Sequence, residues 1–180
     1  MRATGIVRRI DELGRVVIPK EIRRTLRIRE GDPLEIYTDR DGEVILKKYS
    51  PMGDLTDFAG QICESIGKNT GHIAAVCDRD TMIAAYGVQR RELMDKHCSQ
   101  ELEQLMESRK FYRYQPGQAK LHPTDSSERY YLGVSAPILS EGDLMGCVMF
   151  ITPRNSIPCE ELEYKLAQTV ASFLGKQMES

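Results

Sequence analysis

The structure of the N-terminal part depends on the run Gly14-Arg15-Val16-Val17-Ile18-Pro19-Lys20-Glu21-Ile22-Arg23-Arg24-Thr25-Leu26. Residues 15–18, of which Val16, Val17 and Ile18 are β-branched, predict a strand. Pro19 predicts the start of a short helix over 21–26, because proline at a first helical position loses no hydrogen bond. Residues 4–10 predict a second strand, which a loop at 11–14 joins to the first. The order is therefore strand, loop, strand, short helix.

A hairpin is predicted to follow this unit. Gly31-Asp32-Pro33 indicates a turn, residues 34–38 and 44–48 indicate strands, and Asp41-Gly42 is typical of a two-residue hairpin turn. Four short strands in fifty residues bury too little apolar surface to fold alone. We therefore expect an obligate dimer, in which a second copy completes the core formed by Ile6, Ile10, Val16, Ile18, Leu34, Ile36, Val44 and Leu46.

The charge of the chain is strongly uneven. Residues 1–29 carry nine Lys and Arg against three Asp and Glu, a net charge of +6, whereas the whole chain has a net charge of −2. Such a concentration of positive charge indicates a polyanionic partner. The polarity reverses after Ser50-Pro51, and residues 51–180 sum to −5. We expect one domain over 1–50, a linker or helix start at 51–55, and a second domain over 56–180.

The quoted run, followed by Gly31-Asp32-Pro33-Leu34-Glu35-Ile36, resembles the swapped-hairpin DNA-binding domain of AbrB-type transition-state regulators. The resemblance implies that two chains interleave their hairpins into one β-barrel, with both short helices on one face. It implies double-stranded DNA as the partner, read through flexible or A/T-rich sequence. With a second domain of this length attached, it implies a transcription regulator of sporulation genes, either an activator or a repressor.

The resemblance also indicates which residues contact DNA. The family's DNA-contacting arginines fall on Arg8, Arg15, Arg23 and Arg24, and the planar fork of arginine suits phosphate and guanine edges. Adjacent helical positions point about 100° apart, so Arg23 and Arg24 cannot both face the same way. Lys20 is added to this set.

Other interpretations of these basic residues remain open. Arg9 joins the candidate DNA-binding set, although Arg9, Arg27 and Arg29 are also explained by simple solvation. The four matched arginines could instead form a structural salt-bridge network within the dimer. The N-terminal acids Asp11, Glu12 and Glu21 are too few to neutralise the arginines of two chains.

The C-terminal part predicts an α+β fold. A helix is expected over 54–66 with Gly67 as its end, then strands at 72–78 and 81–87, and helical pieces over 92–109 that break at Cys98, where Ser99 caps the second. Extended segments at 111–115 and 129–139, a turn at 140–143, a strand at 144–152 and a helix opened by Pro158 complete the order. This order resembles a GAF domain, a small-molecule sensor with one antiparallel sheet and flanking helices.

The first and last helices of this domain carry apolar stripes. The stripes of 54–66 and 158–178 predict a helical bundle that links two dimers into a homotetramer. The alternative is that these stripes only cover the domain's own sheet.

Tyrosines mark a candidate ligand site. Tyr112, Tyr114 and Tyr131 lie where a GAF-like pocket would have its walls, and their rings and hydroxyls suit an unidentified small molecule. Tyr130 shares an alternating face with Leu132, Val134, Ala136 and Ile138, so we expect it in the core. No cofactor is expected.

Nothing in the sequence predicts catalysis or a metal centre. Cys98 follows His97 without a matching Asp or Asn, which argues against an enzyme. Cys159 follows Pro158 at an expected helix start, so it is either a low-pKa oxidant sensor or an inert surface thiol. His72 and His122 have no metal-ligand spacing.

The sequence also bears on the compartment. Five scattered cysteines, an odd number without zinc spacing, indicate a reducing environment. The sequence has no membrane-length apolar run and no signal segment, so we expect a cytoplasmic, nucleoid-associated protein with no membrane partner.

Two alternative functions stay open. One is an antitoxin, because the same N-terminal fold also occurs in proteins that neutralise a toxin, usually ahead of a disordered acidic tail. The other is a signalling enzyme built on a GAF-like module.

Overall fold

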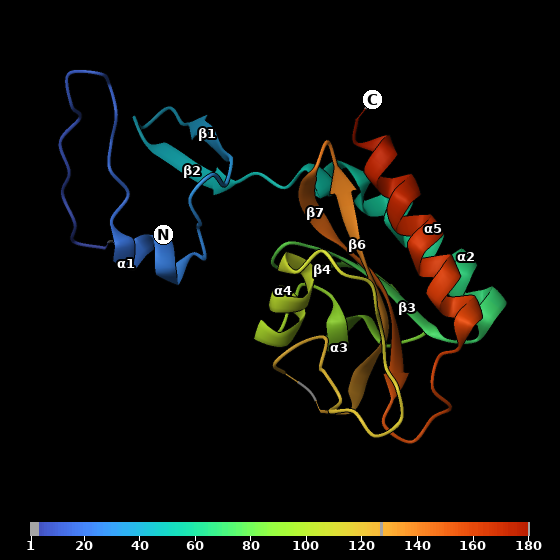
Figure 1. Cartoon of the computed structure of the whole chain (residues 1–180). Helices are drawn as coiled ribbons and strands as arrows, with labels where there is room; N and C mark the ends of the chain where they lie inside the picture. The colour runs from blue at the N-terminus through green and yellow to red at the C-terminus, as the bar shows by residue number, and fades with distance from the viewer. Residues whose placement is uncertain (1–3, 127, 180) are drawn as a thin grey trace. The chain divides into compact units, whose positions relative to one another are not determined.

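The computed structural model describes residues 4–126 and 128–179 (Figure 1). The chain separates into two compact units, and the division falls between Tyr49 and Ser50. Each unit has its own secondary structure.

The N-terminal unit contains one helix and one hairpin. Helix α1 (Lys20–Thr25) follows Pro19, and strands β1 (Leu34–Thr38) and β2 (Val44–Lys48) pair antiparallel. The predicted two-residue turn is wrong, because Asp39 N still donates to the Glu43 carbonyl (3.1 Å) beyond the strand ends. The turn therefore has three residues, 40–42, and ends at Gly42 with φ +81°, a value that favours glycine.

Strands were predicted at 4–10 and 15–18, but in this single chain residues 4–18 contain none. A strand needs a neighbour, and the backbone hydrogen bonds of this segment close a single loop, from Asp11 N to the Arg15 carbonyl (3.0 Å) and from Gly14 N to the Asp11 carbonyl (2.9 Å). Its apolar side chains are exposed, Val7 by 90% and Ile10 by 71%. Among residues 4–49, Pro19 alone is buried. The expected dimer core stays a prediction.

The C-terminal unit is built around one five-stranded sheet. Its strands lie in the order β4-β3-β7-β6-β5, and all neighbours are antiparallel. The elements are η1 (Pro51–Leu55), α2 (Thr56–Thr70), β3 (Ile73–Asp78), β4 (Met82–Tyr86), α3 (Arg90–Leu93), α4 (Gln100–Glu107), β5 (Tyr112–Arg113), β6 (Tyr130–Ser140), β7 (Asp143–Pro153) and α5 (Glu161–Gln177). The α+β class predicted from the sequence is confirmed.

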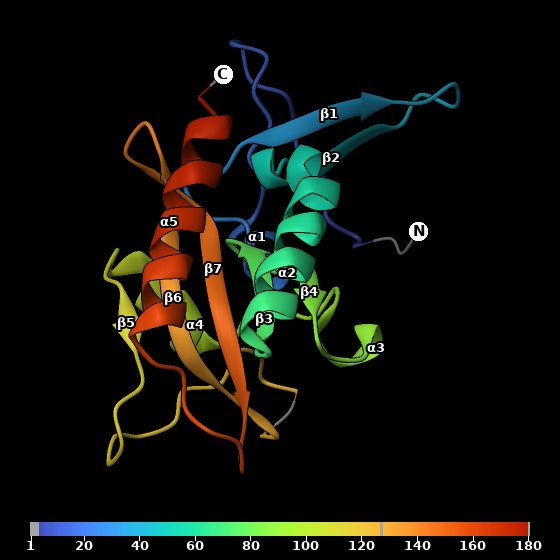
Figure 2. The same ribbon diagram turned by 90° about the vertical axis from the view of Figure 1, so that its right-hand side faces the viewer.

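Both faces of the sheet are covered. Helices α2 and α5 lie on one face (Figure 2), where Ala59, Cys63 and Leu174 pack against the strands. Leu93 of α3 and Leu102 of α4 join the apolar cluster on the other face. The segment 51–55, expected to be a linker or helix start, is the 3-10 turn η1. Its Met52 is buried in the cluster below α2 and α5.

Two helix ends differ from the prediction. Helix α2 continues past Gly67 to Thr70 and ends at Gly71, which has φ +74°. Gly67 is instead required by packing, because any Cβ there would collide with the ring of Tyr86. Helix α5 begins at Glu161 rather than at Pro158, because Glu160 and Glu163 form a capping box that fixes the helix start.

A bulge at Gly133 changes which side chains of β6 share a face. Leu132 lies opposite Ile151, whereas Val134 lies opposite Phe150, so one residue of β6 is unpaired. Tyr130 and Leu132 consequently face the α3/α4 side, and Val134 faces the α2/α5 side. The prediction that Tyr130 shares one face with Leu132, Val134, Ala136 and Ile138 therefore holds only for Leu132. The other three side chains lie on the α2/α5 side. A side chain at Gly133 would lie 2.6 Å from the Cys159 sulfur.

The Ser99 cap predicted for the second helical piece is confirmed. Ser99 Oγ accepts a hydrogen bond from Leu102 N (3.0 Å) and donates one to the His122 carbonyl (2.6 Å). The hydroxyl is buried, and it joins the start of α4 to the segment that precedes β6.

Replacing Ser99 by alanine is expected to lower the free energy of unfolding of the C-terminal unit by about 1–2 kcal/mol, since both hydrogen bonds are lost. Urea unfolding of the full chain measures the change. Ser108→Ala, at the exposed end of the same helix, is the matched control and should change stability by less than about 0.5 kcal/mol. Equal effects of the two substitutions would contradict the capping role.

Candidate nucleic-acid interface

The basic side chains of the N-terminal unit are largely exposed. Arg8 and Arg9 lie in the extended segment before the first loop, and Lys20 and Arg24 project from α1. Arg23 is half-buried, as expected for a helical neighbour of Arg24. Within the described part of the chain, none of these five side chains makes an ion pair. Their charges are therefore available to an anion.

Arg15, in contrast, is held by an acid of its own loop. Asp11 Oδ2 accepts a hydrogen bond from Arg15 Nε (2.8 Å), and Oδ1 accepts from the backbone N–H groups of Arg15 (2.8 Å) and Leu13 (3.0 Å). Gly14 allows the tight loop with φ +75°. The hydrogen bond from the Arg15 backbone N–H, and then that from its side chain, lower the pKa of Asp11.

The C-terminal end of α1 is tied to the hairpin. Arg27 adopts φ +52°, and Lys48 Nζ of β2 donates to its carbonyl (2.9 Å). Lys48 Nζ also lies 3.3 Å from Asp32 Oδ2, which accepts a hydrogen bond from Arg29 N (2.8 Å). The Asp32 side chain is only 4% exposed, so this pair fixes the helix firmly.

Sequence reasoning missed this anchoring role of Asp32 and Lys48. Asp32 was assigned to a turn and Lys48 to the end of a strand. The available signal was an acid placed shortly after a basic helix, where its carboxylate can accept the backbone N–H of a residue in the following turn. Because Asp32 and Lys48 hold the end of α1, the basic side chains of this short helix have defined positions. From there they can bind phosphate oxygens and base edges.

The three candidate ligand-binding tyrosines do not form one group. Tyr114 and Tyr131 pack edge to face with ring centroids 4.9 Å apart, and Lys120 Nζ lies 4.4 Å from the centre of the Tyr131 ring. Tyr112 instead packs against the apolar cluster that α4 covers, and its buried hydroxyl has no hydrogen-bond partner among the described residues. Burial raises the pKa of Tyr131 and of Tyr112.

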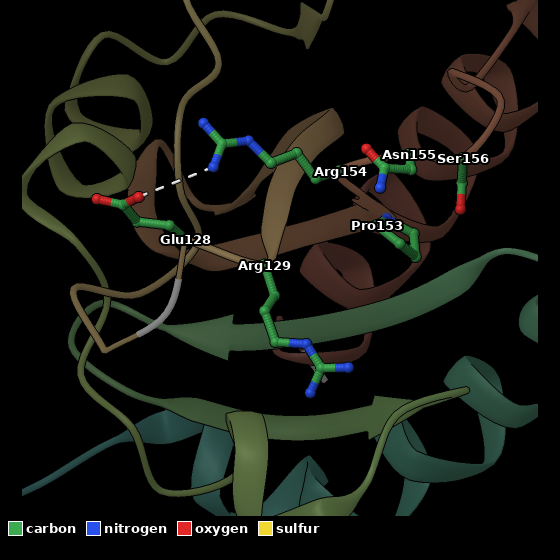
Figure 3. A pocket seen from close by; sticks show the side chains of 6 residues that line it. All are labelled: Glu128, Arg129, Pro153, Arg154, Asn155 and Ser156. Carbon is green, nitrogen blue, oxygen red and sulfur yellow. Dashed lines mark ion pairs between the residues drawn. The ribbon is translucent and has the colours of Figure 1, made fainter.

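A surface pocket of about 430 Å³ lies elsewhere, between the start of β6 and the loop after β7. Its lining does not include the three tyrosines; it consists of Glu128, Arg129, Pro153, Arg154, Asn155 and Ser156. The two guanidinium groups diverge (Figure 3), because Arg154 turns towards Glu128 at 3.9 Å and Arg129 pairs with Glu92 at 3.1 Å. The arginines therefore do not converge on one ligand position.

Cys159 differs from both sequence interpretations. Its side chain is buried, and burial raises the pKa of the thiol to about 11 instead of lowering it. The residue precedes α5 and lies outside its first turn. Cys159 Sγ is 3.8 Å from His72 Nδ1, and His72 Nε2 is 3.8 Å from the buried Glu163 carboxylate. No sequence signal joins residues so far apart.

The other candidate reactive residues are structural. Cys98 is fully buried, its backbone N–H donates to the Asp80 carbonyl (2.8 Å), and His97 is exposed. His122 Nδ1 lies 2.8 Å from the Tyr130 carbonyl. No group of three potential ligands suited to a metal ion occurs in the part of the chain that the structure describes. Within 4–126 and 128–179, no helix combines the length and apolar character needed to cross a bilayer.

Comparison of the sequence with known families gives two matches. Residues 54–179 match the family described as "Stage V sporulation protein T C-terminal, transcription factor", and residues 7–54 match "Antidote-toxin recognition MazE, bacterial antitoxin". Stage V sporulation protein T of Bacillus subtilis (strain 168) is 46% identical over 179 residues, 99% of each chain. Transition state regulatory protein AbrB of the same strain is 69% identical over 51 residues, 28% of this chain and 52% of that protein.

Solved structures resemble each unit separately. The N-domain of the transcription factor AbrB is 67% identical and covers 28% of this chain and 96% of that one, with a TM-score of 0.26. The cofactor-binding GAF domain of the nutrient sensor CodY from Clostridium difficile covers 66% and 83%, with 14% identity and a TM-score of 0.50. The cyanobacteriochrome receptor PixJ covers 72% and 98%, with 13% identity and a TM-score of 0.53. The last two likenesses establish a GAF-like fold.

The native protein is expected to resist thiol reagents, because all five cysteines are buried and burial raises the pKa of Cys63 to about 12 and of Cys159 to about 11. At about pH 8 the thiols of Cys63 and Cys159 stay protonated, and only the thiolate reacts. An aromatic disulfide reagent should modify the native chain far more slowly than the urea-unfolded chain, in which all five thiols react. Rapid native reaction that Cys159→Ser abolishes would restore the oxidant-sensor interpretation.

Proposed function

The chain belongs to the stage V sporulation protein T family of transcription factors, and we propose that it grips double-stranded DNA as a dimer through the arginines of its N-terminal unit. As a member of this family it is a DNA-binding transcription regulator of sporulation. The residue assignment puts Arg8, Arg15, Arg23 and Arg24 on the DNA, with Lys20 and Arg9 beside them.

One observation carries this assignment for every residue except Arg15, whose Nε is bonded to Asp11. The basic side chains at positions 8, 9, 20, 23 and 24 make no ion pair within the described residues, although the whole chain has an excess of acids. A cation without an internal ion pair gains no stabilisation from an acid of its own chain. When such cations neutralise DNA phosphates, the counterions of the DNA are released, and this release favours binding.

The binding mode follows from the size of the elements. Helix α1 has six residues, too few to lie along a major groove and read many bases. Phosphate contacts from two chains, combined with the shape and flexibility of the duplex, then dominate recognition. This supports a preference for flexible or A/T-rich DNA.

The antitoxin alternative is disfavoured by the second unit. Antitoxins of this fold usually continue into a disordered acidic tail, whereas residues 50–126 and 128–179 form a sheet covered on both faces. A signalling enzyme is disfavoured because Cys98 and Cys159 are buried and His97 points to solvent. We infer a regulator without enzymatic activity, located in the cytoplasm on the nucleoid.

The C-terminal unit is proposed to link dimers into a tetramer through α2 and α5. The two helices lie next to each other on the sheet (Figure 2), with the Phe58 and Phe173 ring centroids 5.9 Å apart. Ala59 and Ala171 face the sheet, but Phe173 is 45% exposed. Its outward ring supports packing against another copy.

The same unit is proposed to sense a small molecule. The GAF-like fold and the contact of Tyr114 with Tyr131 support this role, with Tyr112 nearby in sequence and packed on the α4 side. Lys120 adds a positive charge at the Tyr131 ring. Mass spectrometry of molecules retained by the native protein identifies any such ligand.

DNA binding is expected to weaken steeply with salt. Four arginines on each of two chains give a slope of about −7 in a plot of log affinity against log salt concentration, by counterion release. Alanine at positions 8, 15, 23 or 24 should each weaken binding and make the slope shallower. Fluorescence anisotropy with a labelled A/T-rich duplex at several salt concentrations measures both quantities.

Arg91→Ala is the matched control for these substitutions, because Arg91 is an exposed arginine of the C-terminal unit. It should leave affinity and slope unchanged. A variant with alanine at all four of positions 8, 15, 23 and 24 gives the decisive test. The assignment fails if this variant is still dimeric and folded by circular dichroism but binds DNA as tightly as the unsubstituted chain.

The assembly is expected to depend on the exposed ring of Phe173. Phe173→Lys places a charge between the proposed helical partners, so light scattering should report a dimer in place of a tetramer. Ile157→Lys is the control, since Ile157 is 77% exposed but precedes α5. A tetramer that survives Phe173→Lys would reject this interface.

A further inference from the structure

Asp11 is fully engaged within its own loop. One carboxylate oxygen accepts two backbone N–H groups, those of Leu13 and Arg15, and the other accepts the Arg15 Nε–H at 2.8 Å. The backbone closes the same loop, because Asp11 N donates to the Arg15 carbonyl (3.0 Å) and Gly14 N donates to the Asp11 carbonyl (2.9 Å). Every contact lies within five residues, so a single chain supplies them all.

The contact with Asp11 uses the Nε–H of the Arg15 guanidinium and leaves its two terminal nitrogens free of Asp11. Nε lies on the side of the group nearest the chain, whereas the two terminal nitrogens form the fork that binds a phosphate or a guanine edge bidentately. The Arg15 side chain remains 70% exposed although its Nε is bonded. The acid therefore restrains the direction of the arginine without occupying its binding edge.

We propose that Asp11 is a positioning residue for DNA recognition, which orients the Arg15 fork towards the duplex before binding. The proposal rests on the proposed function of Arg15 as a DNA contact. Holding a long flexible side chain in its binding direction removes an ordering cost from association. Asp11 thereby strengthens binding to a polyanion although it is itself negatively charged.

Simple electrostatics makes the opposite prediction. A carboxylate on a DNA-facing surface repels phosphates, so removing its charge should tighten binding. The neighbouring acid Glu12 is exposed, makes no ion pair within the described residues and carries the same charge. The two acids therefore distinguish a positioning role from simple repulsion of phosphates. Loss of the charge should weaken DNA binding at position 11 but leave it unchanged or tighten it at position 12.

The test uses Asp11→Asn in the full chain. Asparagine keeps one oxygen for the two backbone N–H groups and replaces the other by an amide that cannot accept from Arg15 Nε. The loop is thus retained while the contact with Arg15 is lost. Glu12→Gln is the matched control. Circular dichroism and light scattering establish that both variants keep the fold and assembly of the unsubstituted chain.

Asp11→Asn is expected to weaken binding to a labelled A/T-rich duplex by about 3- to 10-fold, whereas Glu12→Gln leaves it unchanged or tighter. The salt slope of Asp11→Asn should become shallower by up to about 2, which corresponds to one weakened phosphate contact on each chain. Unchanged or tighter binding by Asp11→Asn would overturn the proposal.

A double-mutant cycle separates this proposal from the function on which it rests. In an Arg15→Lys background there is no guanidinium to orient, so Asp11→Asn should no longer weaken binding. An equal loss in both backgrounds would assign Asp11 a purely structural role and overturn the proposal. If Arg15→Lys and Arg15→Ala both leave affinity unchanged, Arg15 is not a DNA contact, and the proposed function fails at that residue instead.

Discussion

The N-terminal unit is governed by a shortage of buried apolar surface. Among residues 4–49 only Pro19 is buried, and Ile10, Val17 and Ile36 lie open to solvent. Hydrophobic burial is the main favourable term in folding, and about fifty residues cannot supply enough of it alone. A second copy that covers these side chains would also double the number of arginines facing one duplex. The same constraint thus connects the stability of the unit with its affinity for DNA.

Local interactions compensate where burial is missing. The Asp32–Lys48 pair fixes the end of α1 to the hairpin, and Asp11 fixes the loop that carries Arg15. Both acids satisfy backbone N–H groups as well as a cation, so each serves two purposes. Polar contacts of this kind are directional, which places charges accurately even on a unit with little core.

The sequence predicted features that depend on neighbouring residues and missed those that depend on distant ones. The Ser99 cap, the hairpin of β6 and β7 and the α+β class follow from local patterns, and they were confirmed. The bulge at Gly133 could not be predicted, because Cys159, twenty-six positions later, occupies the space that a side chain there would need. The helix end at Gly67 was misplaced for the same reason, since Tyr86 packs on that glycine. In the candidate site the charge of residues 1–29 indicated a polyanionic partner, and the family resemblance selected the arginines assigned to DNA, but the anchoring by Asp32 needed the fold.

The bulge has a mechanical consequence for the C-terminal unit. Before Gly133, the even-numbered side chains Tyr130 and Leu132 belong to the layer that contains α4; after it, the even-numbered side chains Val134, Ala136 and Ile138 belong to the layer that contains α2 and α5. Leu132 and Val134 are two residues apart in one strand, and the bulge places them on opposite faces of the sheet. A change in packing around Leu132 on the α4 side is therefore expected to reach α2 and α5 through β6 itself, without passing through a loop.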